Sequence, residues 1–428
     1  MNLGDLVEQH LSVEASAIIK SVGQIAADLN QLVYLVGGAV RDVLLARSST
    51  DLDFVTEGSG IELAQAVQEQ HGGELTTHER FGTAVWTPPS ELFAETIDFI
   101  TARKEVYAHP AALPDVTPST MHDDLFRRDF TINALAVPLV GNNVGAILDL
   151  YGGQTDLENG LIRVLHPQSF SDDPTRIFRA LRYAGRLDFS LEKETALALK
   201  NSLEQIGLLS ADRLRHEFEK IFAEPNPQPI LELLNRFGVM AKISNHIGWN
   251  NNHHAAFETL KTVVKTKPGS IAVQESGMAN LRLLAWICAS AQPSKVADEL
   301  AETLNLSADL RQDLKNILQF SSPDINIAAD GKPGSIEKAF RHFNETQLAI
   351  LQIVDFLPHQ IKDSISTYFT QWRQIKTFSD GNTLRQLGIP PGPIYKKILD
   401  ELIAAKLNGE VTTEQDELDL IKAIGEIQ

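Results

Sequence analysis

The sequence feature that most constrains the fold is a change of hydrophobic pattern near residue 160. Before it, short apolar runs alternate with turn residues: LVYLVGG, DLDFVT, TAVWTP, TIDFITA and GAILDLYGG. Runs of this length, bounded by Gly, Pro, Ser and Asp, are typical of strands and turns. After it, apolar residues recur at helical spacing, as in PTRIFRALRYAGRL and SADRLRHEFEKIFAE. We therefore predict an α+β protein in which a small mixed sheet is followed by an all-helical region.

The same pattern predicts how the chain divides. At 428 residues the chain is too long for one ordinary hydrophobic core. We expect a mixed head at residues 1–160, which opens with a helix over residues 1–31. A helical neck at 161–225, a helical body at 226–375 and a helical tail at 376–428 should follow.

Composition limits the compartment and the partners. The 38 basic and 56 acidic residues leave a net charge of −18, which argues against a generic nucleic-acid binder, since such proteins are usually basic. Any RNA contact must then come from a local basic strip. The single cysteine, Cys288, lies in an apolar run and is expected to be a buried thiol in a reducing cytosol. No apolar run reaches the ~18 residues that span a bilayer, so we predict a cytoplasmic protein without membrane contact.

Two aspartates separated by one residue are the first candidate site. If DLDFV is a strand, Asp51 and Asp53 project from the same face, because side chains alternate along a strand. Two close carboxylates repel each other unless a cation lies between them, and Mg²⁺ prefers such oxygen ligands. An exposed strand face or aspartate turn chemistry is the alternative explanation.

The residues around this pair favour the metal site. Gly37 and Gly38 lie between a predicted strand and a predicted helix, where backbone N–H groups can approach a phosphate. Arg41 lies one turn into that helix. Glycines, arginine and acids together suit a triphosphate and a metal ion, so Gly38 and Arg41 are nucleotide-binding candidates. A third acid is expected on a neighbouring strand, and Asp98 is either that catalytic acid or a buried acid satisfied by the backbone or Arg103.

Four stretches carry a family resemblance: GGAVRDVLL…DLDFVT (37–56), DDLFRRDFTINALA (123–136), DLYGGQTDLENGLIRVL (149–165) and DDPTRIFRALRYAGRL (172–187). They resemble the class II nucleotidyltransferases of the polymerase-β type, which include bacterial CCA-adding enzymes and poly(A) polymerases. Weaker similarity extends to SADRLRHEFEKIF (210–222) and to the tail at 381–418. The resemblance implies a polymerase-β-like head whose first motif binds metal and phosphate. It also implies that the fourth motif selects the nucleotide, although Asp172 and Tyr183 replace the family's usual Glu and Phe.

The fourth motif offers a way to select a base. Asp173 and Arg176 are three residues apart, so on one helix their side chains would be neighbours. A carboxylate that accepts an amino hydrogen and a guanidinium that donates to a ring acceptor would take cytosine or adenine and reject uracil or guanine. A surface ion pair is the alternative. Arg179 and Arg182 continue the stripe at three-residue spacing and are further nucleotide-binding candidates.

Two adjacent arginines in the second motif are also candidates. Arg127 and Arg128 precede an apolar, strand-like run and suit sugar and phosphate contacts, with Arg128 as the nucleotide-binding candidate. A salt-bridge network with Asp123 and Asp124 is the alternative.

The predicted function follows from the resemblance. It implies template-independent transfer of CMP and AMP from CTP and ATP to the 3′ end of tRNA, by a two-metal mechanism with Mg²⁺ held by Asp51 and Asp53. A partial enzyme that adds only CC or only A, and a poly(A) polymerase, remain alternatives, as does a catalytically dead RNA-binding module. Lys396, Lys397 and Lys406 are expected to contact RNA phosphates near a helix start. A homo-oligomer remains possible.

Overall fold

The computed structural model describes residues 9–112, 114–141, 143–265, 275–320, 330–354 and 357–426. The chain forms two compact units, residues 1–213 with 229–242 and residues 214–228 with 243–428. The predicted head lies in the first unit and the predicted tail in the second. The finer division into four domains stays a prediction.

A mixed sheet forms the centre of the first unit, in the order β10-β8-β1-β2-β5-β4-β3, with β9 paired to β8. Strands β2 and β5 run parallel, whereas β1 pairs antiparallel with both β2 and β8. The five apolar runs predicted as strands are confirmed as β1, β2, β4, β5 and β10. The bounds are β1 (Val33–Val36), β2 (Leu52–Thr56), β3 (Glu74–His78), β4 (Thr83–Thr87), β5 (Ile97–Thr101), β8 (Leu135–Val140), β9 (Asn143–Val144) and β10 (Leu148–Asp149). Two smaller sheets pair β6 (Arg103–Val106) with β7 (Asp115–Pro118) and β11 (Leu161–Ile162) with β12 (Ser190–Leu191).

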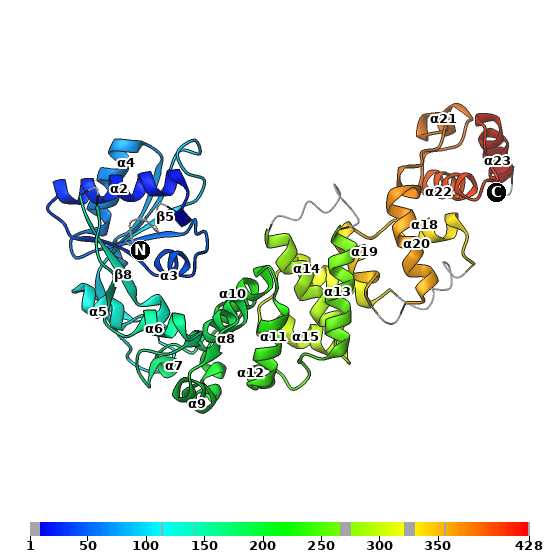
Figure 1. Ribbon diagram of the computed structural model, residues 1–428. Helices are drawn as coiled ribbons and strands as arrows, with labels where there is room; N and C mark the ends of the chain where they lie inside the picture. The colour runs from blue at the N-terminus through cyan, green and yellow to red at the C-terminus, as the bar shows by residue number, and fades with distance from the viewer. Residues whose placement is uncertain are drawn as a thin grey trace. The chain divides into compact units, whose positions relative to one another are not determined.

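The two faces of the sheet differ in what covers them. On one face, the rings of Phe54 and Phe99 stack at 5.4 Å, and Trp86 donates to the carbonyl of Gly72 at the end of α4. Helices α2 and α4 lie together beside the sheet (Figure 1). The opposite face carries Asp53, and farther along it an apolar cluster that includes Val55 packs against α5. The helices of the head are α2 (Val13–Asp28), α3 (Gly38–Leu44), α4 (Gly60–His71), α5 (Met121–Phe126) and α6 (Gly153–Glu158).

The N-terminal helix is shorter than predicted within the described residues, since α2 covers 13–28 and residues 1–8 lie outside them. Ser12 begins α2, and its hydroxyl accepts from the backbone N–H of Ala15, as an N-cap does. The helices predicted from periodicity after residue 160 are confirmed. They comprise α7 (Ser169–Asp172), α8 (Thr175–Leu187), α9 (Lys193–Asn201), α10 (Ala211–Ala223), α11 (Gln228–Arg236) and α12 (Val239–Ile243).

The second unit is helical throughout the residues that the structure describes there. Its core includes the rings of Phe218, Phe222 and Trp286, whose centroids lie 5.5–6.1 Å apart. Cys288 is buried, as predicted. No helix among the described residues is long and apolar enough to cross a membrane. The helices are α13 (Asn251–Lys265), α14 (Glu275–Cys288), α15 (Pro293–Thr303), α16 (Ala308–Leu318), α18 (Pro333–Phe340), α19 (Glu345–Leu351), α20 (His359–Thr370), α21 (Gly381–Gln386), α22 (Pro393–Leu407) and α23 (Glu414–Glu426).

Candidate active site

The two aspartates converge on one glycine turn of the first unit. Asp53 lies in β2, opposite Val36 of β1, and Asp51 immediately precedes the strand. A Cβ atom placed on Gly37 would lie 3.6 Å from Oδ2 of Asp53, and one placed on Gly38 would lie 3.7 Å from Oδ2 of Asp51. Both carboxylates therefore face the turn between β1 and α3, as strand alternation predicts.

Asp98 is the direct neighbour of Asp53 across the parallel strands β2 and β5. Burial raises the pKa of Asp53 to about 7, the negative charges of Asp51 and Asp98 raise it further, and Arg128 opposes them. Burial also raises the pKa of Asp98, with Asp51 adding to the effect and His78 opposing it. The expectation of a third acid on a neighbouring strand is thus confirmed, although its role stays a prediction.

Arg103 does not satisfy Asp98. Its guanidinium donates to Glu105 at 3.2 and 3.3 Å and to the carbonyl of Phe81. Asp98 therefore faces the other two acids with its pKa raised, and the proposed pairing with Arg103 is wrong.

The donor set suits a hard divalent cation, because Asp51 and Asp53 offer carboxylate oxygens that repel each other when both are ionised. Within the described parts of the chain, however, no group of three or more His, Cys, Asp or Glu side chains is arranged to hold a metal ion. Asp51 and Asp53 remain the predicted ligands, and Asp98 gains no support as a third one.

Arg128 reaches the same turn. Its Nη1 would lie 3.1 Å from a Cβ atom on Gly37 and donates to the carbonyl of Asn133 at 3.3 Å. Its Nη2 donates to Asp124, as does Arg127, so the salt-bridge alternative is correct with Asp124 as the shared acid. The network does not remove Arg128 from the site, because it holds the guanidinium beside Asp53.

Arg41 borders the turn but is strongly engaged. Its side chain is buried, and it donates to both carboxylate oxygens of Asp42 and to Oδ1 of Asn133, at 2.7–3.0 Å. Its Nη2 would lie 3.7 Å from a Cβ atom on Gly38, the same distance as Oδ2 of Asp51. The guanidinium and the carboxylate thus flank Gly38 from two sides.

The predicted pairing of Asp173 with Arg176 on one helix is wrong. Asp173 is extended (φ −136°, ψ 98°) and precedes α8, because the following residue, Pro174, disfavours a helical conformation there. Its Oδ1 accepts from the backbone and the hydroxyl of Thr175, as a helix cap does, and from Arg213 at 2.6 Å.

The arginines of α8 are held by long-range partners. Arg176 is buried and donates to the hydroxyl of Ser169 and the carbonyl of Arg127, both at 2.7 Å. Arg179 donates twice to Oδ2 of Asp129, at 2.8 and 2.5 Å. Although burial raises the pKa of Asp129, Arg179 outweighs this effect, and the pKa falls to about 2. The guanidinium of Arg182 lies 5.4 Å from the ring of Tyr183.

Sequence reasoning missed several of these partners. Asn133 bridges Arg41 and Asp129, and Arg213 holds Asp173 across 40 residues of sequence. Asn133 lies inside the quoted motif FTINALA and Arg213 inside SADRLRHEF, so the resemblance was the available signal for both. No spacing rule would have paired them.

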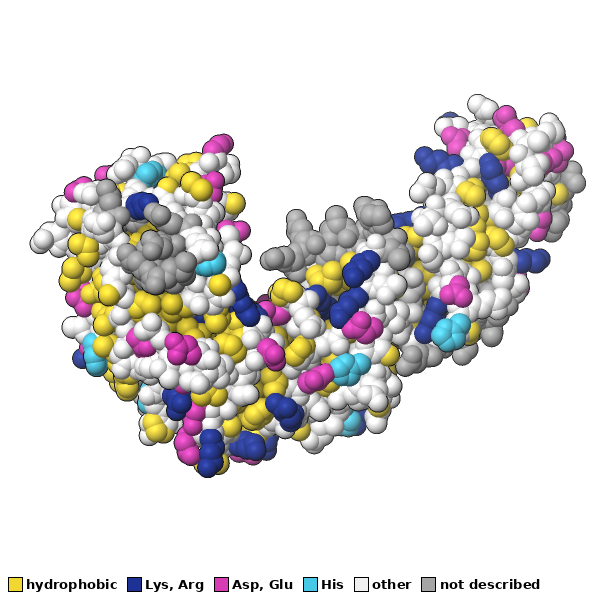
Figure 2. All heavy atoms as spheres, viewed as in Figure 1, with side chains coloured by type: hydrophobic (Ala, Val, Ile, Leu, Met, Phe, Trp, Pro, Cys, Tyr) yellow, Lys and Arg dark blue, Asp and Glu magenta, His cyan; other side chains and the backbone are white. Residues whose placement is uncertain are grey.

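The three tail lysines do not form one cluster. Lys396 and Lys397 are exposed in the first turn of α22, whereas Lys406 lies in the last turn, 3.5 Å from the buried Glu417 and 3.5 Å from the centroid of the Phe378 ring. The prediction that Lys406 lies near a helix start is therefore wrong. On the visible face, basic and acidic side chains are interspersed over the molecule rather than gathered in one large patch (Figure 2).

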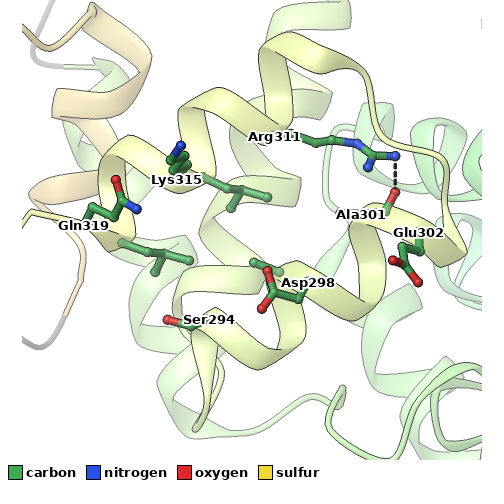
Figure 3. A pocket seen from close by; sticks show the side chains of 10 residues that line it. Ser294, Asp298, Ala301, Glu302, Arg311, Lys315 and Gln319 are labelled. Atoms are coloured by element: carbon green, nitrogen blue, oxygen red, sulfur yellow. Dashed lines mark hydrogen bonds between the residues drawn. The ribbon is translucent and has the colours of Figure 1, made fainter.

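A groove of about 570 Å³ in the second unit lies between α15 and α16. Asp298 and Glu302 of α15 and Arg311 and Lys315 of α16 line it (Figure 3). Arg311 donates to the carbonyls of Ala301 and Leu306 and so fastens the connection between the two helices. The mixed charges of this groove and the absence of histidine or cysteine from its lining give it no evident reactive group.

Comparison with known proteins agrees with this geometry. Residues 33–163 match the family model described as the poly A polymerase head domain, and residues 188–247 match one described as the probable RNA and SrmB-binding site of polymerase A. An A-adding tRNA nucleotidyltransferase of Halalkalibacterium halodurans is 31% identical, and the match covers 98% of this chain and 95% of the relative. The chain belongs to the tRNA nucleotidyltransferase and poly(A) polymerase family, and is therefore a nucleotidyltransferase.

Other similar proteins differ in length and in the nucleotides named. An A-adding enzyme of Geobacter sulfurreducens is 32% identical over 96% of this chain, which spans 47% of that relative. A CCA-adding enzyme from Thermotoga maritima, solved in complex with tRNA, is 26% identical with a TM-score of 0.78, and the match covers 99% of this chain and 98% of that one. An apo CCA-adding enzyme matches with a TM-score of 0.82 at 27% identity, over 99% of both chains. The predicted family and the predicted fold class are confirmed.

Proposed function

We propose that this chain transfers nucleotidyl units from ATP or CTP to the 3′ end of tRNA. The observation that carries the proposal is the convergence of Asp51 and Asp53 on the Gly37–Gly38 turn, with Arg128 beside them. Similar CCA-adding enzymes have been solved with tRNA, with ATP and with CTP, which supports these partners. The cytoplasmic location and any homo-oligomer stay predictions.

The residues of the turn divide the work. Asp51 and Asp53 would hold Mg²⁺, and a bound divalent ion supplies positive charge at the attacking hydroxyl and the reacting phosphate. Gly37 and Gly38 leave room for the phosphates to approach the backbone, since neither carries a side chain. Arg128 places a positive charge next to Asp53, where negative charge moves onto the leaving pyrophosphate.

Asp173 and Arg176 are proposed to select the base, although they are not paired with each other. Asp173 keeps its second oxygen for an amino group, since the contacts found for it use Oδ1. Arg176→Ala should reduce the preference for A and C over U and G, because a wrong base would no longer leave a buried donor unsatisfied. Unchanged discrimination in that variant, measured with four labelled nucleotides, would contradict the assignment.

Addition of the terminal A is the form of the reaction that the relatives favour. The two relatives at 31% and 32% identity over nearly the whole chain are both named A-adding. Full CCA addition is the second candidate, which the TM-score of 0.82 to a CCA-adding enzyme supports. CC addition is a third outcome, because a relative of that name is 34% identical over 55% of this chain.

One experiment separates these outcomes. The protein is incubated with Mg²⁺, labelled ATP or CTP, and tRNA that ends before CC, after the first C, or after CC. Extension of only the last substrate, and only by A, supports the proposal. Extension of all three supports full CCA addition, and no extension of any substrate contradicts nucleotidyl transfer to tRNA.

Asp53→Asn tests the acid pair. It should reduce incorporation at least about 100-fold, because a ligand and a negative charge are both lost from the predicted cation site. The matched control is Asp115→Asn, at an exposed aspartate of β7, which should leave incorporation unchanged. Comparable turnover in the two variants would refute the role of Asp53.

A further inference from the structure

Tyr183 lies at the centre of an unusual concentration of positive charge in the first unit. Four guanidinium carbons lie 5.1–5.6 Å from the centroid of its ring. We call this set the arginine collar: Arg41 from α3, and Arg179, Arg182 and Arg186 from α8. Arg179 and Arg186 are four residues before and three residues after Tyr183, so they share its helix face.

The collar closes a circuit of contacts across three elements. Arg41 donates to Asn133, Asn133 donates to Asp129, and Asp129 accepts from Arg179. Arg179 in turn lies 3.4 Å from the hydroxyl of Tyr183, whose ring faces Arg41. Tyr183 therefore joins the helix that begins at the glycine turn to the helix that carries the arginine stripe.

Carboxylates contribute to the circuit, but they do not explain why the arginines meet. Asp42 pairs with Arg41 and, at 4.0 Å, with Arg186. Like charges repel, so bringing four guanidinium groups to one ring is unfavourable unless the ring and an anion compensate. The ring supplies a negatively polarised surface, and a polyphosphate chain would supply the anion.

We propose that Tyr183 is a positioning residue whose ring orients the arginine collar toward the polyphosphate of the nucleotide. This inference rests on the proposed function and adds a specific residue to it. Tyr183 does not touch the reacting atoms. It acts through Arg41, which flanks Gly38 together with Asp51, and through the arginines of α8.

The test compares the binding of ATP and AMP, without RNA, by equilibrium dialysis. Tyr183→Met removes the ring, nearly preserves the volume and keeps a good helix former. The Kd for ATP should rise about tenfold, because the cation–π contacts that hold the collar are lost. The Kd for AMP should change less than about twofold, since its base and ribose do not depend on the collar.

Two further variants locate the effect. Tyr183→Phe keeps the ring and should bind ATP within about threefold of the wild type, so a tenfold loss there would overturn the role of the ring. Phe178→Leu, at a buried ring of the same helix, is the structural control. It should lower the melting temperature but leave the ratio of the two dissociation constants unchanged.

The outcomes decide the proposal. Equal weakening of ATP and AMP by Tyr183→Met would mean that Tyr183 only stabilises the fold, and unchanged ATP binding would also overturn the proposal. If Tyr183→Met fails to fold, Arg186→Gln replaces it, since this side chain is about one-third exposed, and unchanged ATP affinity there would refute the collar. A wild-type protein that binds ATP but extends no tRNA would contradict the proposed function alone.

Discussion

The glycine turn before α3 permits a paired test of backbone strain and of phosphate access. Gly37 has φ +68° and ψ −125°, a conformation that residues with a Cβ atom rarely adopt. A methyl group there would also lie 3.1 Å from Nη1 of Arg128, so the guanidinium would have to move by a few tenths of an ångström. Gly38 is the first residue of α3, and a methyl group there meets its nearest neighbours at an ordinary 3.7 Å.

The magnitudes differ for the two positions. A residue forced into such a conformation costs about 1–3 kcal/mol. Taking about 2 kcal/mol for Gly37→Ala, and a fall of roughly 2–4 °C per kcal/mol for a unit of about 200 residues, we expect the melting temperature to drop by roughly 4–8 °C. Gly38→Ala should change stability by less than about 1 kcal/mol, because replacing Gly at an unstrained helical position is neutral or stabilising.

The two substitutions should have the opposite order of effect on stability and on function. The methyl group of Gly38→Ala would fill the space between Arg41 and Asp51, so ATP affinity should fall at least about tenfold, or ~1.4 kcal/mol, in a folded protein. Thermal unfolding followed by circular dichroism and ATP binding by calorimetry measure the two effects separately. Equal melting temperatures for the two variants would refute the strain argument. Wild-type ATP affinity in Gly38→Ala would refute the approach of phosphate to the turn.

Three further predictions concern charges away from the turn. The pKa of Asp129 is about 2 in the folded chain, below its ordinary value of about 3.9, so this carboxylate stabilises the fold by about 2 kcal/mol above pH 4 and loses the effect as pH falls toward 2. The difference in urea-unfolding free energy between wild type and Asp129→Asn should narrow over that range, and a constant difference would contradict the sign. Lys406→Met should destabilise the second unit by roughly 2–4 kcal/mol, because the buried carboxylate of Glu417 loses its cation, and an unchanged unfolding transition would contradict this. Lys397→Met should leave stability unchanged and weaken tRNA binding with a smaller salt dependence, whereas wild-type binding at low salt would exclude a phosphate contact.

The sheet was predictable where hydrophobic burial dominates. The runs that became β1, β2, β4 and β5 contribute fully buried residues such as Leu35, Phe54, Trp86 and Phe99, and their alternation placed Asp53 on the opposite face. Strand β3 (ELTTH) escaped the pattern because it is an edge strand whose side chains are mostly exposed, so no apolar alternation marks it.

Residues that lie close in sequence were placed correctly in the candidate site, and pairs distant in sequence were not. The spacing of Asp51, Asp53 and the glycines was sufficient, because one strand and one turn position them. The expectation of a neighbouring acid also held, because the parallel pairing of β2 and β5 sets Asp98 beside Asp53.

The partners of the α8 arginines show what local spacing leaves undetermined. Three-residue spacing predicts which side chains share a helix face, but it does not say what that face meets. Arg179 finds Asp129 fifty residues upstream, and Asp173 finds Arg213 forty residues downstream, because the fold brings those elements together. These contacts fix side chains that would otherwise lose conformational entropy on binding a nucleotide. The charges that a sequence suggests are free for a ligand are therefore already oriented by other charges, and this preorganisation is what a site for a triphosphate requires.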